Sequence, residues 1–220
     1  MDMKRKKKLN IIIVGLVILL YSCAEDDSFT QSPGALLSVV RDTITLDTAF
    51  SNVPTPMRTF WVYNHSGKNL RCKSVVLSGG NQTGFRVNVD GAYLSDKQGY
   101  QVSGIEIRNN DSARVAVELT SAYNREKEAQ LVEDKLVFVL ESGVRLPIVL
   151  RGYSWDAQLM RGLRIQRDTT LSGDKPLVFY APIIVEQGAQ LTLAAGTTLY
   201  FHDNAGIDVL GSLLSQGRQG

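Results

Sequence analysis

Residues 39–153 alternate between polar and apolar side chains with a period of two, and this pattern constrains the fold more than any other feature of the chain. Turn-forming Gly, Asn, Asp and Ser residues separate the alternating segments, which are all short. The pattern predicts strands at 42–50, 58–64, 69–77, 85–91, 104–112, 113–120, 134–142 and 144–153. Short strands at this spacing favour an all-β fold in which 39–153 form an antiparallel β-sandwich.

Two connections in this region carry their own signals. Glu141, Ser142 and Gly143 predict the tight turn of a hairpin between the last two strands. Residues 121–134 are the one segment in which a helical turn is expected.

Two stretches of the sandwich region resemble a known group of domains. "FWVYNHSGKNLRCKSVVLSGGNQTGFRVNV", followed by "IEIRNNDSARVAVELT", is similar to the Ig-like sandwiches related to the ASH and major-sperm-protein group. In that group a strand ends in Asn, a polar turn follows, and a second strand leads to a Gly-rich loop and a buried Phe. The resemblance implies a spacer or a protein-binding module and implies no catalytic residue.

The sequence changes character after Tyr153. Residues 154–179 have a mixed pattern and are predicted to be a connector. From residue 180 onward short apolar segments are punctuated by glycine, and "VEQGAQL" is echoed by "LAAGTTL" and then by the shorter "VLGSLL". Repeated apolar strands that turn at glycine are typical of a parallel β-helix.

This C-terminal stretch resembles the opening rungs of right-handed β-helices that follow an Ig-like domain in Bacteroidota surface lipoproteins. Residues 180–220 supply one or two rungs, whereas a solenoid buries its apolar faces only by stacking about three or more rungs. We therefore expect the 220 residues to be a truncation or a fragment of a longer β-helix protein. The alternative is a small β-meander, over 176–217, that packs on the sandwich.

The N-terminal residues have the three parts of an export signal. Five of the chain's 24 basic residues lie between positions 4 and 8, and an apolar run follows from Leu9 to Leu20. Twelve residues of helix span roughly 18 Å, less than the ~30 Å hydrocarbon core of a bilayer. Residues 1–22 are thus predicted to be a signal peptide. Because these basic residues would be removed with the signal peptide, the remaining chain is slightly acidic and shows no basic face for nucleic acid.

The residues "LYSC" at the end of the apolar run resemble the lipobox of bacterial lipoproteins, in which the Cys is alkylated by diacylglycerol and becomes the first residue of the mature chain. Cys23 is the predicted lipidation site, and Tyr21 is bulkier than the usual residue at its position. An ordinary secretory signal, or a Cys that awaits a disulfide, is the alternative. Residues 28–37 are rich in Ser, Gln, Pro and Gly, and residues 23–38 are predicted to be a flexible, lipidated tether.

The acidic residues Glu25, Asp26 and Asp27 directly follow the predicted lipid site. In Bacteroidota lipoproteins such a cluster resembles the signal that sends the protein to the outer face of the outer membrane, although a charge run is also a plain solvated tether. We expect a lipid-anchored outer-membrane protein that faces the cell exterior. The resemblance extends to an Asp-(Ser/Thr)-apolar O-glycosylation motif, and the candidate acceptors are Thr43, Thr48, Ser112 and Thr169.

Signals for catalysis or metal binding are few. His65 and His202 are the two histidines and are not at ligand spacing, so no metal, cofactor or catalytic residue is predicted. Cys72 lies in an alternating segment and is expected to be a buried thiol rather than a nucleophile. Trp61 and Trp155 are expected to pack in the core or between domains rather than to face a ligand.

Three functions remain from the sequence. The first is a non-enzymatic surface lipoprotein that serves in binding or adhesion, with an unspecified protein or glycan partner. The second is a structural or assembly spacer. The third is a fragment of a β-helix carbohydrate-active enzyme, for which these residues supply no catalytic group.

Overall fold

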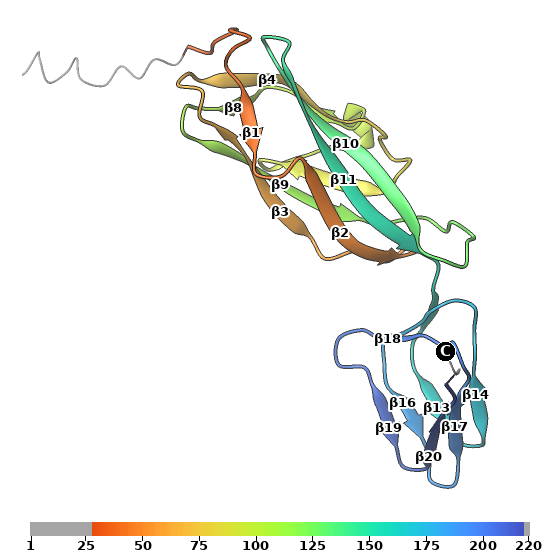
Figure 1. Cartoon of the computed structure of the whole chain (residues 1–220). Helices are drawn as coiled ribbons and strands as arrows, with labels where there is room; N and C mark the ends of the chain where they lie inside the picture. The colour runs from red at the N-terminus through yellow and green to blue at the C-terminus, as the bar shows by residue number, and fades with distance from the viewer. Residues whose placement is uncertain (1–27, 218–220) are drawn as a thin grey trace, which may run out of the picture.

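The alternating segments form two β-sheets in the computed structural model, which describes residues 28–217. The first sheet comprises β1 (Leu37–Val39), β3 (Arg58–Asn64), β9 (Ser112–Leu119), β5 (Phe85–Val89) and β6 (Ala92–Tyr93), in that spatial order. The second comprises β2 (Thr43–Phe50), β11 (Arg145–Trp155), β10 (Gln130–Leu140), β4 (Leu70–Leu77) and β7 (Gln101–Val102). β8 (Ile105–Ile107) also pairs with β4, and Asp96–Gln98 form a short 3₁₀ turn, η1. Figure 1 shows these strands as one elongated body.

The two sheets face each other across one apolar core. In β9, for example, Ala113, Val115, Val117 and Leu119 are buried while their neighbours are exposed or half-buried, as a period of two requires. The core contains 26 buried apolar residues drawn from both sheets. The prediction of an all-β fold is confirmed, and each of the eight predicted strands overlaps an observed one.

One strand pair departs from the antiparallel prediction. β2 pairs with β11 in parallel, from Thr43 opposite Val149 to Phe50 opposite Trp155. The reason is that β1 and β2, although consecutive, lie in different sheets, so the chain crosses between sheets instead of making a hairpin. The predicted hairpin turn at 141–143 is confirmed: β10 and β11 are antiparallel, and Gly143 has a φ of +86°.

The predicted flexible tether over 23–38 is wrong in its described part, because residues 28–38 pack on the sandwich. Phe29 bridges Asn69, the N–H of Thr30 donates to the carbonyl of Asn69, and the Phe29 ring contacts the Arg71 guanidinium at 4.1 Å. Ala35 and Leu37 are buried in the sandwich core, and Leu37 begins β1. These apolar side chains, which lie among polar neighbours in the sequence, hold the segment in place.

The predicted helical turn in 121–134 is also wrong. Residues 121–129 form an irregular loop, and β10 begins at Gln130. The backbone N–H groups of Asn124 and Arg125 donate to the side chain of Asp156 instead of to helical carbonyls. A distant carboxylate therefore decides the conformation of this loop.

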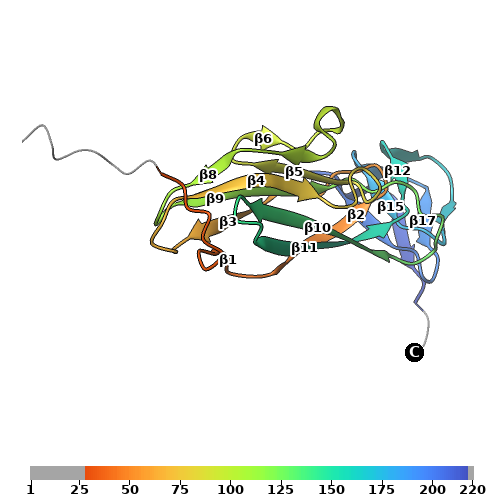
Figure 2. The same cartoon turned by 90° about the horizontal axis from the view of Figure 1, so that it is seen from above.

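Residues 158–215 form three parallel sheets of three strands each. Their orders are β12-β15-β18, β13-β16-β19 and β14-β17-β20, so each strand pairs with the strand three positions further along the chain. The first three strands are β12 (Gln158–Met160), β13 (Leu163–Ile165) and β14 (Thr169–Leu171). The next three are β15 (Leu177–Phe179), β16 (Ile183–Val185) and β17 (Gln190–Leu193). The last three are β18 (Leu199–Phe201), β19 (Ile207–Val209) and β20 (Ser212–Ser215). We call 158–215 the parallel-strand unit. Figures 1 and 2 place it beyond the end of the sandwich at which β2 and β11 finish.

This unit corrects two predictions. The expected connector, 154–179, holds the end of β11, all of β12 to β14 and β15, because its apolar residues pair with the later repeats rather than with one another. The alternative of a β-meander is excluded by the parallel pairing of every sheet in the unit. Seven buried apolar residues, from Ile165 to Leu191, form its separate core.

Glycines mark the corners of the unit, as the repeats indicated. Gly188 and Gly196 have φ values of +85° and +86°, a region that other residues rarely occupy. A Cβ on Gly211 would collide with the carbonyl oxygens of Glu186 and Ala189, so the chain passes there backbone against backbone. Nowhere within 28–217 does the chain form a helix of the length and apolar character that a membrane crossing needs.

Candidate functional site

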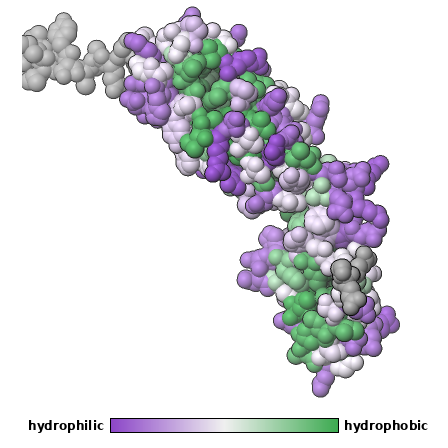
Figure 3. All heavy atoms as spheres, viewed as in Figure 1, coloured by the Kyte–Doolittle hydropathy of each residue, from purple (hydrophilic) through white to green (hydrophobic). Residues whose placement is uncertain are grey.

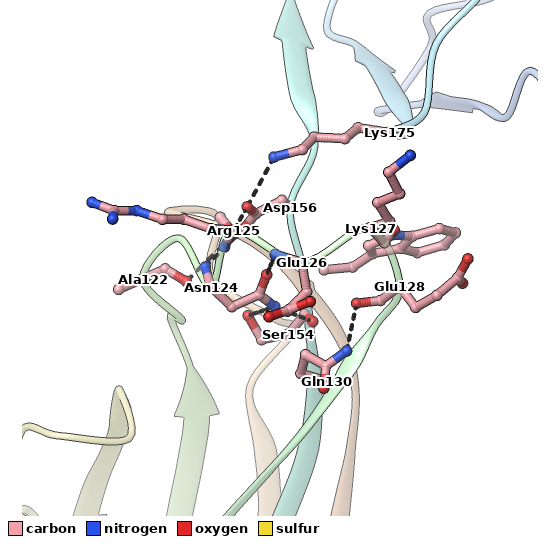
Figure 4. Close-up of polar contacts among 12 residues, drawn as sticks. Ala122, Asn124, Arg125, Glu126, Lys127, Glu128, Gln130, Ser154, Asp156 and Lys175 are labelled. Atoms are coloured by element: carbon pink, nitrogen blue, oxygen red, sulfur yellow. Dashed lines mark hydrogen bonds and ion pairs between the residues drawn. The ribbon is translucent and has the colours of Figure 1, made fainter.

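Asp156 is a buried carboxylate between β11 and β12, where the sandwich meets the parallel-strand unit. Its Oδ1 accepts hydrogen bonds from the Ser51 hydroxyl at 2.6 Å and from the Asn124 N–H at 3.0 Å. Its Oδ2 accepts from the Arg125 N–H at 2.9 Å and from the Lys175 ammonium at 3.0 Å. We call these five residues the Asp156 network; Figure 4 shows loop 121–129 and Lys175 converging on it from two sides.

The network keeps Asp156 ionised. Burial by itself would raise the pKa of this carboxyl, because the charged form loses its water. The hydrogen bonds from Ser51, Asn124, Lys175 and Arg125 favour the charged form and together lower the pKa to about 2. Because both oxygens are already engaged by donors, Asp156 is suited to fixing the junction rather than to acid or base chemistry.

An aromatic cluster forms the other side of the junction. The ring of Tyr200 in β18 lies edge-on to Phe50 at 4.8 Å and to Trp155 at 6.4 Å. The indole N–H of Trp155 donates to the carbonyl of Lys127 at 2.8 Å. The predicted role of Trp155 in packing between domains is confirmed. The Asp156 network has no local sequence signal, since Ser51 lies 105 positions from its partner.

A groove beside β3 is the candidate binding site of the sandwich. It encloses about 330 Å³, within the range of about 300–1,000 Å³ of small-ligand sites. Its lining residues are Val39, Val40, Arg41, Ile44, Arg58, Thr59, Phe60, Trp61 and Tyr63. They belong to β3, to the end of β1, to the crossing from β1 to β2, and to the start of β2. We call this feature the β3 edge groove.

Trp61 in this groove corrects a sequence prediction. It was expected in the core, but its side chain is directed to the outer face of the sheet and the residue is 44% exposed. The alternation in β3 places Phe60 and Val62 inward, so Trp61 between them must point outward. The neighbouring outward residue, Tyr63, stacks on His65 at 5.7 Å.

The predicted site residues fall in different parts of the chain. Cys23, Glu25, Asp26 and Asp27 lie outside the described residues. The four candidate O-glycosylation acceptors all start or lie within strands: Thr43 and Thr48 in β2, Ser112 in β9 and Thr169 in β14. Thr48 is exposed, and the other three are half-buried. The structure does not gather them into one site.

The histidines and acids of the described residues form no metal centre. No group of three or more His, Cys, Asp or Glu side chains in residues 28–217 is placed to hold a metal ion. His202 stacks on Tyr180 at 4.9 Å, and Asp203 follows it in a turn with a φ of +54°. Neither histidine shares a hydrogen bond with a carboxylate within the described part of the chain.

Cys72 is fully buried in β4, as predicted, and burial raises the pKa of its thiol to about 12. Only about one thiol in 10⁴ is then ionised at pH 8, and the thiolate is the reactive form. We expect iodoacetamide to leave Cys72 of the folded protein unmodified for hours at pH 8 and to alkylate it at once in guanidinium chloride. Mass spectrometry of tryptic peptides measures both states. Alkylation of the native protein would contradict a sealed core around Cys72.

Comparisons with known proteins give structural likeness only. No family model matches the sequence, and no curated protein matches it. Solved structures that resemble the chain include the ASH/PapD-like domain 7 of human CEP192, with 11% identity over 62% of this chain and 97% of that domain and a TM-score of 0.37.

Two further solved structures resemble part of the chain. A family 123 glycoside hydrolase from Clostridium perfringens shares 7% identity over 55% of this chain and 26% of its own length, with a TM-score of 0.34. A protein of unknown function from Porphyromonas gingivalis W83 shares 14% identity over 62% of this chain and 60% of its own length, with a TM-score of 0.39. No conclusion about the activity of this chain rests on them.

Proposed function

We propose that this chain is a lipid-anchored envelope lipoprotein, exposed at the outer face of the outer membrane, with a non-enzymatic role in binding or adhesion. The anchor is Cys23, and the signal peptide, the lipobox-like "LYSC" and the acidic residues 25–27 support this placement. The observation that carries the binding role is the β3 edge groove, where an exposed Trp61 lies beside an opening that is large enough for a ligand.

The distance between the anchor and the sandwich is short. Only five residues separate Cys23 from Phe29, which bridges Asn69 on the sandwich. A fully extended segment of this length spans at most about 20 Å. The sandwich would therefore be held close to the lipid surface, with the parallel-strand unit at its opposite end, directed away from the membrane (Figure 1).

We further infer that the parallel-strand unit is a set of β-helix rungs. In each of the three sheets the strands succeed one another in the order expected of a coil with three strands per turn. Equivalent residues of successive turns lie in register and stack, as Phe179 does on Phe201 at 5.8 Å. The last turn leaves Val209, Leu210, Leu213 and Leu214 more than 40% exposed, and Figure 3 shows apolar residues gathered on this unit.

A spacer role is the second candidate. The observation that favours it is the Asp156 network, in which the buried carboxylate at the end of the sandwich pairs with the partly exposed Lys175 of the parallel-strand unit. A spacer needs such a fixed junction, because a flexible one would not hold the distal unit at a set height.

Replacing Cys23 tests the anchor. We expect Cys23→Ala, expressed in a bacterial host that is fed an alkyne fatty acid, to lose all lipid labelling and to leave the membrane fraction, because the acylated thiol is absent. Cys72→Ala is the matched control, since its buried thiol is not the acceptor, and it should keep both properties. A labelled, membrane-bound Cys23→Ala protein would disprove the anchor, and protease shaving of intact cells tests surface exposure separately.

A further inference from the structure

The N-terminal half of β3, residues 58–61, is an open strand edge. β1 pairs with β3 only at Val62–Asn64, because the chain then leaves the first sheet for β2. On its other side β3 pairs with β9 along its length, from Arg58 to Tyr63. Within the described residues, no strand pairs with 58–61 on the side of β1. Backbone groups on an open edge of this kind are a template for a further strand.

The β3 edge groove lies along this open edge rather than on one face of the sheet. Phe60 points into the core and Trp61 points to the outer face, yet both line the same groove. Side chains that alternate between opposite faces of a sheet can border one opening only where that opening follows the strand edge. The groove is therefore shaped to receive an extended chain that continues the line of β1.

The positive charge of the groove determines which kind of peptide segment it can bind. Arg41 and Arg58 both line it, both are exposed, and neither forms an ion pair with a residue in 28–217. Positive side chains beside an open edge repel basic strands and attract acidic ones. Val40, Ile44 and Trp61 add apolar groups to the same lining, and Val40 is 83% exposed.

We infer that the β3 edge groove binds an extended acidic segment of a partner protein, which adds to the first sheet as a strand beside residues 58–61. Backbone hydrogen bonds to β3 provide affinity, Arg41 and Arg58 pair with carboxylates, and an apolar side chain covers Trp61. This inference rests on the proposed binding function and specifies its partner.

Fluorescence polarisation with the full chain in detergent tests the inference. The probe is a fluorescein-labelled nonapeptide of alternating valine and glutamate, and we expect saturable binding that weakens as salt is added. Replacing its glutamates with lysines, or N-methylating alternate backbone amides, should abolish binding. Arg41→Gln with Arg58→Gln, and separately Trp61→Ala, should each weaken binding by about tenfold or more. Tyr93→Ala and Arg145→Gln are the matched controls, because both residues are exposed and lie outside the groove, and they should bind normally.

Three results would overturn the inference. They are equal binding of the lysine peptide, equal binding of the N-methylated peptide, and unchanged binding by the groove variants. Binding of polygalacturonate in place of the peptide, lost in Trp61→Ala, would also overturn it and would identify an acidic glycan as the ligand. None of these results alters lipid labelling at Cys23, so failure of this inference is distinct from failure of the proposed anchor.

Discussion

Asp156→Ala is expected to lower the free energy of unfolding by about 3–5 kcal/mol, because it leaves three donors at the junction without an acceptor, at a cost of about 1–3 kcal/mol each. The N–H groups of Asn124 and Arg125 lose their acceptor, and so does the Ser51 hydroxyl. Lys175 loses its counter-ion in the same step. Urea unfolding at pH 7, followed by circular dichroism, measures the change.

Lys175→Met is the control that separates the network from its outer ion pair. The Lys175 side chain is 42% exposed, so its loss should cost less than about 1 kcal/mol. Equal losses in Asp156→Ala and Lys175→Met would show that the exposed ion pair, and not the buried network, holds the junction.

The same carboxylate predicts how the stability varies with pH. The folded protein lowers the pKa of Asp156 from 3.8 to about 2, so the unfolded chain takes up the proton first as the pH falls. Its contribution is complete above about pH 4 and is lost between pH 4 and 2. The difference in stability between the wild type and Asp156→Ala should therefore shrink across this window.

The sandwich was predictable from the sequence because burial on one face of a strand leaves a period of two. β9 shows this plainly: its inward positions are Ala113, Val115, Val117 and Leu119, and the strand formed where expected. β1 was missed because three residues are too few to display a period, although Leu37 is buried. Trp61 was misplaced because its inward neighbours made the whole segment look apolar.

Only the later strands of the parallel-strand unit could be predicted from the sequence. Its later strands carry glycine at their corners, such as Gly188 and Gly196, and these glycines marked the repeat. Its first turn, β12 to β14, has a glycine at only one corner, Gly162, and contains Arg164 and Thr170 at outward positions, so the segment resembled a connector. Parallel pairing is set between residues about 20 positions apart, which no short window of sequence reveals.

The candidate site was the least predictable part. Asp156 acts through Ser51, Asn124 and Lys175, which come from three separate stretches of the chain and share no motif. The β3 edge groove depends on where β1 ends and on the sheet to which β2 moves, and neither is a local property. The proposed lipid site at Cys23 is the opposite case, since a lipobox-like motif is read as a linear sequence and needs no fold.

Phe179→Ala is expected to unfold the parallel-strand unit while the sandwich remains folded. Phe179 is fully buried, and deleting a buried Phe side chain costs about 3–5 kcal/mol. The core of the unit contains only seven buried apolar residues, against 26 in the sandwich, so the same loss removes a much larger share of its stability. Hydrogen–deuterium exchange with mass spectrometry should show lost protection in 158–215 and retained protection in 37–155.

Phe138→Ala in the sandwich is the matched control, because Phe138 is equally buried and loses the same atoms. That variant should stay folded throughout at reduced stability, since the larger core tolerates one cavity. If Phe179→Ala instead exposes both regions together, the Asp156 network couples them into one cooperative unit. Loss of protection in both regions together would mean that the buried junction contributes more to the stability of the parallel-strand unit than its own seven-residue core does. In that case Asp156→Ala should give the same exchange pattern as Phe179→Ala.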